Sequence, residues 1–211
     1  MSAHPIPFMA PPYSSSIRDA AAAQKKARVV QEATKLLRTS DRVTAVSLDV
    51  VAKAAGVTRL TVYNQFGSRR GLLEAVLDNL ASKAGFERIR EVMALEDPAQ
   101  ALGELIDVIC RAWGYDESIA SIHAAASIDP EFLEVVNQRM ERRRKAIQVL
   151  VRRMVEAGAV RKSAGPELVD VLDAMTSYSV FETLRARGRS TAAVSRMMRG
   201  ACLAVVGTHT A

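Results

Sequence analysis

The side chains whose types and spacing suggest chemistry lie in one stretch, AAGVTRLTVYNQFGSRRGLL, from Ala54 to Leu73. At helical spacing, Val62 and Phe66 share one face and should point inward. The opposite face can meet the base edges of a DNA major groove, where Arg pairs with guanine, Asn with adenine, and apolar groups touch the thymine methyl. The residues expected to read bases are Arg59, Leu60, Thr61 and Asn64.

Other polar side chains around this stretch can hold a nucleic-acid backbone. Contacts to phosphate position a protein on the duplex without reading its sequence. The first backbone N–H groups of a helix that starts after Gly67 can also meet a phosphate. The residues expected to contact phosphate are Ser47, Thr58, Tyr63, Gln65, Ser68 and Arg69.

The capping signals predict two short helices that present these side chains. Ser47 and Thr58 can cap the two N-termini, and Gly56 follows the first helix where a left-handed residue is favoured. Gly67 should end the second helix, and Ser68 can cap the next one. The first helix would pack through one apolar stripe, Leu48, Val51, Ala52 and Ala55. Helix, tight turn and helix form the helix-turn-helix motif, which is typical of DNA readers. The alternative is a helical hairpin that serves only as core.

The charge distribution favours the same region. The chain of 211 residues carries a net charge of +6. Residues 1–84 hold 12 Lys/Arg and 6 Asp/Glu, whereas residues 85–211 hold 17 of each. A local basic field is the footprint of a module that binds a polyanion, although a chance imbalance on a solvated face would look the same.

Composition predicts an all-α protein without catalytic machinery. Hydrophobic residues make up 49%, charged residues 25% and aromatic residues only 5%. No run approaches the roughly 20 apolar residues of a membrane span, and no secretory signal is visible. Cys110 and Cys202 lie far apart, which favours a reducing, cytoplasmic setting. With only His4, His123 and His209 and no phosphate loop or metal motif, we expect no enzyme, no cofactor and no metal.

The stretch VSLDVVAKAAGVTRLTVYNQFGSRRGLLEAVL resembles the DNA-binding domain of the TetR (TetR/AcrR) family of bacterial transcriptional regulators. The motif ends in Tyr63 and Phe66, followed by a short polar pair, a basic residue and Leu72-Leu73. The match covers about residues 29–77. Arg69 replaces the more usual lysine, and Asp49 stands where some relatives have a basic or polar residue that faces DNA, so Asp49 would repel phosphate.

The resemblance implies a ligand-responsive repressor that binds a palindromic operator in double-stranded DNA as a homodimer. Two rivals remain: an architectural DNA binder without a sensor, and a helical small-molecule-binding protein whose DNA domain is vestigial. The first predicts little specificity and a steep salt dependence of affinity, and the second predicts no sequence-selective binding.

Helix signals divide the chain into three parts. A flexible tail is predicted at residues 1–16, a DNA-binding domain at 17–84, and an effector-binding and dimerisation domain at 85–211. Nine helices are expected, at 17–39, 48–55, 58–66, 69–95 with a break near Gly85, 98–114, 117–127, 130–158, 166–187 and 190–206, with a polar loop at 40–45.

The last two predicted helices are apolar over more than one stripe, so one stripe can face the core and another a partner chain. The alternative is that both are buried within a monomer. The dimer candidates are Leu172, Tyr178, Phe181, Met197, Met198, Ala201 and Val205.

Large aromatic and methionine side chains of the second domain are candidates for the wall of an effector pocket. They are Phe86, Met93, Cys110, Trp113, His123, Met140, Met175 and Tyr178. This set suggests a small to medium-sized, mainly apolar effector, while His123 could equally be a core residue. The run RMERRRKAIQVLVRRM, from Arg139 to Met154, is interpreted as a solvated face, with a second DNA contact as the alternative.

Overall fold

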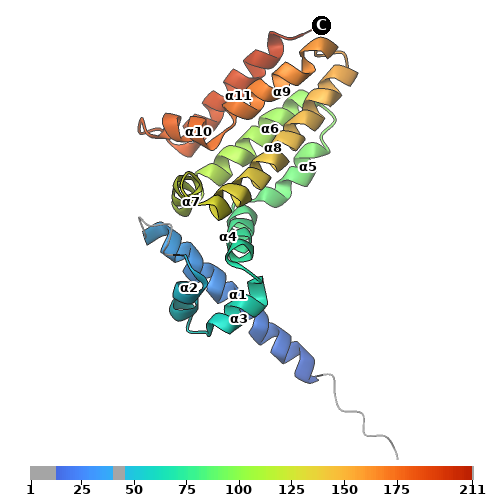
Figure 1. Ribbon diagram of the computed structural model, residues 1–211. Coiled ribbons are helices and arrows are strands. Elements are labelled where there is room, and N and C mark those ends of the chain that lie inside the picture. The colour runs from blue at the N-terminus through green and yellow to red at the C-terminus, as the bar shows by residue number, and fades with distance from the viewer. Residues whose placement is uncertain (1–12, 40–45, 211) are drawn as a thin grey trace, which may run out of the picture.

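The computed structural model describes residues 13–39 and 46–210, and every regular element in these two ranges is a helix (Figure 1). The order is α1 (Tyr13–Thr39), α2 (Leu48–Ala55), α3 (Arg59–Phe66), α4 (Arg69–Lys83), the 3₁₀-helix η2 (Phe86–Arg88), α5 (Ile89–Met93), α6 (Pro98–Trp113), α7 (Ser118–Ala126), α8 (Pro130–Glu156), the 3₁₀-helix η3 (Lys162–Ala164), α9 (Gly165–Met175), α10 (Tyr178–Arg185) and α11 (Thr191–Gly207).

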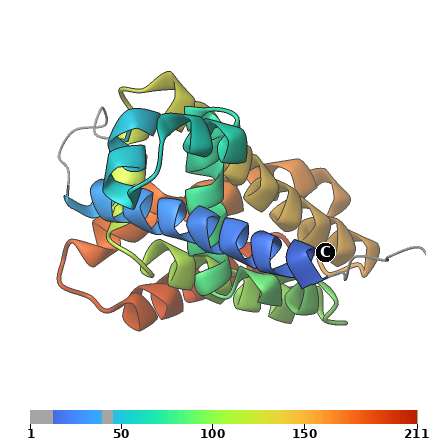
Figure 2. The same ribbon diagram turned by 90° about the horizontal axis from the view of Figure 1, so that it is seen from below.

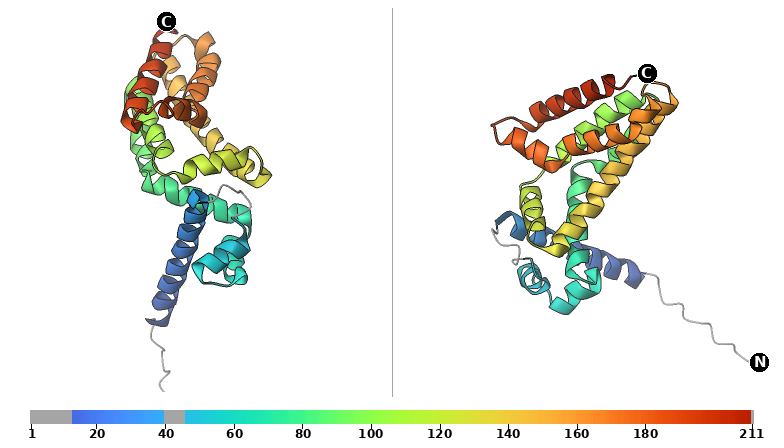
Figure 3. Two further views of the ribbon diagram at one scale, coloured as in Figure 1. Left: turned by 90° about the vertical axis from the view of Figure 1, so that its left-hand side faces the viewer. Right: turned by 45° about the horizontal axis from the view of Figure 1, so that its top comes forward.

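The helices form a small N-terminal group and a larger bundle that α4 joins. In Figure 1, α1, α2 and α3 lie at one end, and α6, α8, α9 and α11 run side by side toward the C-terminus at the other. The view from below shows α1 crossing this end with α2 and α3 beside it (Figure 2). Part of α1 extends away from the bundle (Figure 3). Helix α4 contacts both α1 and α8, so it connects the two groups.

Two clusters of buried side chains hold the fold together. One fills the bundle between α6, α8, α9 and α11 and includes Leu102, Ile106 and Leu150. The other lies under α1 to α4 and includes Val51 and Val62. This second cluster continues into α7 and the start of α8, so helices α1 to α4 share their core with elements beyond residue 84.

The predicted boundaries of the helix-turn-helix are confirmed, because local capping determines them. The hydroxyls of Ser47, Thr58 and Ser68 each accept a hydrogen bond from a backbone N–H in the first turn of the following helix, at 3.2, 3.1 and 3.0 Å. Gly56 has φ +63° and donates its N–H to the last carbonyls of α2, as a left-handed C-cap does.

The all-α prediction is confirmed, but the described residues form eleven α-helices, not nine. The break expected near Gly85 in the segment 69–95 is present, because Gly85 takes φ +82°, outside the helical range. The segment 166–187 is divided at Thr176, whose carbonyl accepts hydrogen bonds from Arg143 (2.8 Å) and Trp113 (3.3 Å). Ser177 then caps α10.

The first helix begins at Tyr13 and so includes part of the segment predicted as a tail. No capping signal marks this start, and the prediction rested on the four prolines before residue 13. Residues 1–12 of the predicted tail and the predicted loop at 40–45 lie outside the described residues.

Candidate nucleic-acid interface and cavity

Helix α3 presents a ridge of side chains to solvent. Leu60 is 66% exposed and Tyr63 56% exposed, unusual for large hydrophobic residues, and Arg59 and Asn64 are exposed as well. Thr61 is half-buried. On the opposite face Val62 is fully buried against α1 and α2, which fixes the orientation of the ridge.

The expected base-reading arginine lies beside an acidic residue. The Nε atom of Arg59 is 3.5 Å from Oδ1 of Asp49 at the start of α2, and both side chains are two-thirds exposed. Asp49 is therefore on the surface that the sequence analysis assigns to DNA. Its charge offsets that of Arg59 and would oppose a nearby phosphate.

The three capping hydroxyls among the predicted phosphate contacts, Ser47, Thr58 and Ser68, use a lone pair to accept from the backbone. Ser47 and Ser68 keep an O–H that can donate to a phosphate oxygen, whereas the hydroxyl of Thr58 also forms a hydrogen bond with that of Thr61, at 2.9 Å. Gln65 is different, because its Oε1 atom is buried without a hydrogen-bond partner among the described residues. Its amide points at least partly inward.

Arg69 is engaged within the chain. Its Nε donates to the carbonyl of Val46 (2.8 Å), and its Nη1 lies 2.8 Å from Asp129 and 2.9 Å from Glu131 at the start of α8. The guanidinium also lies over the ring of Phe132, 5.1 Å from its centroid. Arg69 thus joins Val46, the residue before the Ser47 cap of α2, to the start of α8. A phosphate would have to compete with two carboxylates for Arg69.

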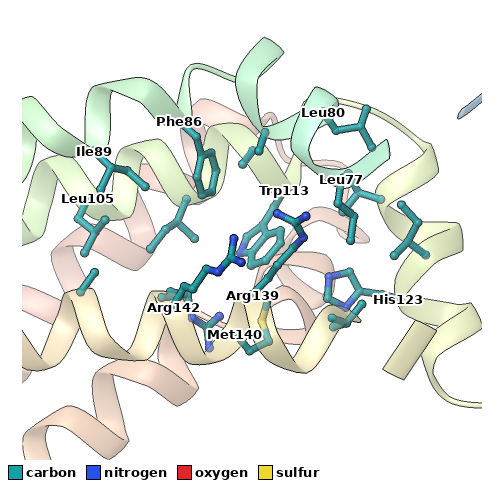
Figure 4. A pocket seen from close by; sticks show the side chains of 18 residues that line it. Leu77, Leu80, Phe86, Ile89, Leu105, Trp113, His123, Arg139, Met140 and Arg142 are labelled. Carbon is teal, nitrogen blue, oxygen red and sulfur yellow. The ribbon is translucent and has the colours of Figure 1, made fainter. Parts of the chain in front are cut away.

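A cavity of about 260 Å³ lies between α4, α6, α7 and α8. Four of the predicted pocket residues line it, namely Phe86, Trp113, His123 and Met140 (Figure 4). The other walls are mostly apolar side chains that the sequence analysis did not select, among them Leu77, Leu80, Ile89, Leu105, Ile109 and Ile122. Aliphatic side chains at helical spacing are typical of an ordinary core, and only the fold shows that the core is hollow here.

The remaining four pocket candidates do not line the cavity. Cys110 is fully buried against Met198, with their sulfur atoms 3.6 Å apart. Met93 and Met175 pack on the core of the bundle. Tyr178 lies behind the wall, where its ring stacks on His123 at 4.1 Å.

His123 belongs to an aromatic cluster at the edge of the cavity. Its ring stacks on Tyr178 and meets Trp113 edge to face at 5.4 Å. Burial, with a smaller contribution from the nearby charge of Arg143, lowers the pKa of His123 to about 4. The imidazole is therefore neutral at physiological pH and acts as a polar aromatic wall.

The arginine-rich run on α8 is only partly a solvated face, which corrects the sequence interpretation. Arg139, Arg142 and Arg143 line the cavity; the side chains of Arg143 and Arg139 are only 9% and 20% exposed, whereas Arg142 is exposed to solvent as well. Arg144 and Arg152 lie on the outside and pair with Asp170 and Glu156. The missed signal is the spacing of Arg143 from the half-buried Met140 and from three buried residues, which places Arg143 in their apolar stripe; the three are Val136, Ile147 and Leu150.

The dimer candidates fall into two groups. Leu172, Phe181 and Met198 are at most 2% exposed and belong to the core of this chain, so their side chains are not available to a partner. The apolar stripes of α9, α10 and α11 that contain these three residues face the core. Met197 is 42% exposed, Ala201 is exposed, and Val205 is half-buried on the outer side of α11. Tyr178 is half-buried against His123.

Within residues 13–39 and 46–210, no group of three or more His, Cys, Asp or Glu side chains could hold a metal ion. In the same ranges, no helix is both long and apolar enough to cross a membrane.

Comparison with known proteins relates the helix-turn-helix segment to a family of regulators. The sequence profile described as "Bacterial regulatory proteins, tetR family" matches residues 43–76, the segment that contains α2 and α3. The HTH-type transcriptional regulator EthR of Mycolicibacterium smegmatis is 29% identical over 159 residues, which cover 74% of this chain and 70% of that protein. The helix-turn-helix segment therefore matches the TetR family, and the likeness to EthR and to the TetR-family structures supports a regulator of that family. The architecture of the chain is that of a DNA-binding transcriptional regulator, and regulators of the TetR family are in general not enzymes.

Solved structures of the TetR fold superimpose on most of the chain. A putative TetR-family transcriptional regulator from Rhodococcus sp. aligns with a TM-score of 0.68 and 14% identity, over 87% of this chain and 99% of that one. A putative transcriptional regulator from Saccharomonospora viridis, crystallised in complex with choline, aligns with a TM-score of 0.62 and 16% identity, over 84% of this chain and 95% of that one. At such identities the likeness concerns the fold.

Proposed function

We propose that this chain is a ligand-responsive repressor of the TetR family, which binds a palindromic operator as a homodimer and is released when a small, mainly apolar effector enters the cavity. The observation that carries the proposal is the exposed ridge of α3, with Leu60 66% exposed above a fully buried Val62. A structural hairpin would not need a large apolar side chain in solvent.

In the proposed complex α3 lies in the major groove. Arg59 and Asn64 meet base edges, while Leu60 and the methyl group of Thr61 touch thymine methyls. The capping hydroxyls and Tyr63 donate to phosphates on either side. We keep the division proposed from the sequence, with DNA binding in residues 17–84 and sensing and dimerisation in 85–211.

The exposed side of α11 supports the proposal of a homodimer. Met197, Ala201 and Ala204 are exposed at helical spacing, and Gly200 adds no side chain between them. Small residues allow two helices to approach closely, and a two-fold dimer places two recognition helices about one DNA turn apart.

The position of the cavity supports control by an effector. Leu77, Leu80 and Ala81 of α4 form one wall, and α4 follows α3 after only Gly67 and Ser68. An effector that displaces α4 would therefore move the recognition helix. Its effect is a population shift toward a dimer whose two α3 helices no longer match the groove spacing.

Choline, which the Saccharomonospora viridis protein binds, is a cation. We do not extend that ligand to this chain, since three arginines line its cavity. An architectural role without an effector remains the second candidate, and the cavity of about 260 Å³ argues against it.

Selection of binding sites from random duplex DNA, followed by sedimentation analysis of the complex, tests the proposal. We expect a palindromic consensus bound by two chains. Recovery of no consensus, with affinity for every duplex falling steeply with salt, would support the architectural binder instead.

A further inference from the structure

The cavity that we assign to the effector is apolar in its interior and cationic on one side. Its lining comes mostly from leucine, isoleucine, alanine and aromatic side chains of α4, α6 and α7. On α8, Arg139 and Arg142 extend into the space opposite Phe86 and Trp113 (Figure 4). A smaller, polar hollow of about 90 Å³ shares Arg139 and Arg142 with the cavity. These two guanidinium groups therefore stand at the boundary between an apolar chamber and a polar one.

The arginines around this boundary are not all neutralised by carboxylates. Arg143 pairs with Asp173 at 2.8 Å, and Arg139 pairs with Asp78 at 2.9 Å. Glu74, the other carboxylate of the polar hollow, pairs with Arg70 at 3.0 Å. Arg142 is exposed to solvent, and among the described residues none forms an ion pair or a hydrogen bond with it.

Arg139 is also incompletely satisfied. Its Nη2 donates to the carbonyl of Glu74 (3.0 Å) and to Asp78, but its Nε is buried without an acceptor among the described residues. A buried donor without an acceptor is costly, and guanidinium groups are well suited to bind carboxylates. The boundary thus offers one unpaired cation and one unused donor to an anion.

The size of the cavity limits the rest of the ligand. At about 30 Å³ for each water-sized group, about 260 Å³ holds roughly nine such groups. Only the apolar body of the ligand must fit inside, since its charged end would lie at the two arginines.

From this geometry we infer that the effector is an amphipathic anion: a carboxylate bound by Arg142 and Arg139, on an apolar body of about seven to nine carbon atoms. The inference rests on the proposed function in that it assigns the cavity to the effector. It narrows the ligand class from mainly apolar molecules to those with one negative terminal group, and it excludes cationic amphiphiles.

Calorimetric titration of the full chain without DNA tests the inference with octanoate, octan-1-ol, octyltrimethylammonium and acetate. We expect octanoate to bind at least about tenfold more tightly than octan-1-ol, because one charge-assisted contact is worth about that factor. The cationic octyl compound and acetate should not bind measurably. Octan-1-ol binding as tightly as octanoate, or the cation binding more tightly, would overturn the inference, as would no binding of octanoate at millimolar concentration.

Variants of Arg142 test whether this side chain supplies the positive charge that binds the carboxylate. Arg142→Gln should weaken octanoate about tenfold and leave octan-1-ol unchanged, and Arg142→Lys should retain part of the preference. Arg152→Gln is the matched control, since Arg152 is exposed on the same helix and pairs with Glu156. Because Arg142 has no partner in the described chain, its variants should fold, which thermal unfolding checks. An unchanged octanoate preference in Arg142→Gln contradicts the inference.

The inference about the effector and the repressor proposal can fail independently of each other. If another compound releases the protein from its selected duplex while octanoate does not bind, the inference fails and the repressor proposal stands. If octanoate binds through Arg142 but no duplex is selected, the inference stands and the repressor proposal fails.

Discussion

Asp116, between α6 and α7, makes an ion pair whose contribution to the free energy of unfolding can be calculated from its pKa. Its carboxylate accepts hydrogen bonds from Arg38 Nε (2.8 Å), Ser118 N (2.9 Å) and Ser118 Oγ (2.7 Å), and only 6% of its side chain is exposed. Burial by itself would raise the pKa of Asp116, but the hydrogen bonds and the charge of Arg38 outweigh it and lower the pKa from 3.8 to about 2. The pair joins α1 of the DNA-binding helices to α7.

The change in pKa sets both a magnitude and a pH range. Because the folded state holds the charged form more strongly than the unfolded state, the contribution is complete above pH 3.8 and is lost as the pH falls toward 2. At 1.36 kcal/mol for each pKa unit it amounts to about 2 kcal/mol at neutral pH, and about half of it is lost by pH 3. We therefore expect Asp116→Asn to lower the unfolding free energy by about 2 kcal/mol at pH 7, a shift in Tm of about 4 to 8 °C.

Urea unfolding of wild type and Asp116→Asn at pH 7, 5 and 3 measures this difference. Asp170→Asn is the control, since that carboxylate is 66% exposed and its surface pair with Arg144 should contribute little. The reasoning is refuted if Asp116→Asn unfolds like wild type at pH 7, or if its deficit is the same at pH 3 as at pH 7.

Three further outcomes follow from the structure. Gly71→Ala should lower the unfolding free energy by about 1 to 3 kcal/mol and weaken operator binding, because a Cβ there would lie 2.1 Å from the carbonyl oxygen of Phe66; urea unfolding and gel shift test this, and wild-type values for both would contradict it. Asp49→Asn should strengthen operator binding several-fold with little change in Tm, since it frees Arg59 and removes a charge facing phosphate; unchanged or weaker binding by fluorescence anisotropy would count against the proposed surface. Stability should fall as the pH drops from 6.5 toward 4, because the unfolded state binds the proton that folded His123 resists; His123→Gln should flatten the decline of Tm over this range, and an unaltered slope would disprove the assignment.

The helix boundaries and the exposed face of the helix-turn-helix could be predicted from the sequence, because each depends on a few neighbouring residues. Ser47, Thr58 and Ser68 cap the helices that follow them, and Gly56 adopts the left-handed conformation that a C-cap favours. Val62 is buried, and Leu60 is exposed, as their spacing indicated. The roles of these exposed residues in reading DNA stay predictions.

Contacts between residues far apart in the chain could not be predicted. The break of the segment 166–187 depends on Arg143 and Trp113, which reach the carbonyl of Thr176 from two other helices. The ion pairs of Arg69 join residues about 60 positions apart, so no local pattern indicates that Arg69 has a role within the chain.

The candidate pocket was only half predicted, for a similar reason. Residue type alone suggested Trp113 and Met140, which line the cavity, and equally Met175, which does not. Charged residues of a long helix are usually solvated, and Arg142 is exposed as that rule indicates; only the packing of α8 against α4 shows that Arg139 and Arg142 also border the cavity.

The most direct test of the central claim, that α3 reads base pairs, is the ratio of affinities for a selected operator and a scrambled duplex. We would measure it at fixed salt for wild type, Asn64→Ala and Gln148→Ala, the last an exposed residue of α8 away from α3. A bidentate contact to adenine is worth about 1 to 3 kcal/mol of discrimination, so Asn64→Ala should reduce the ratio by about tenfold, while Gln148→Ala leaves it unchanged. A wild-type ratio close to one, or one that Asn64→Ala leaves unaltered, would contradict the account.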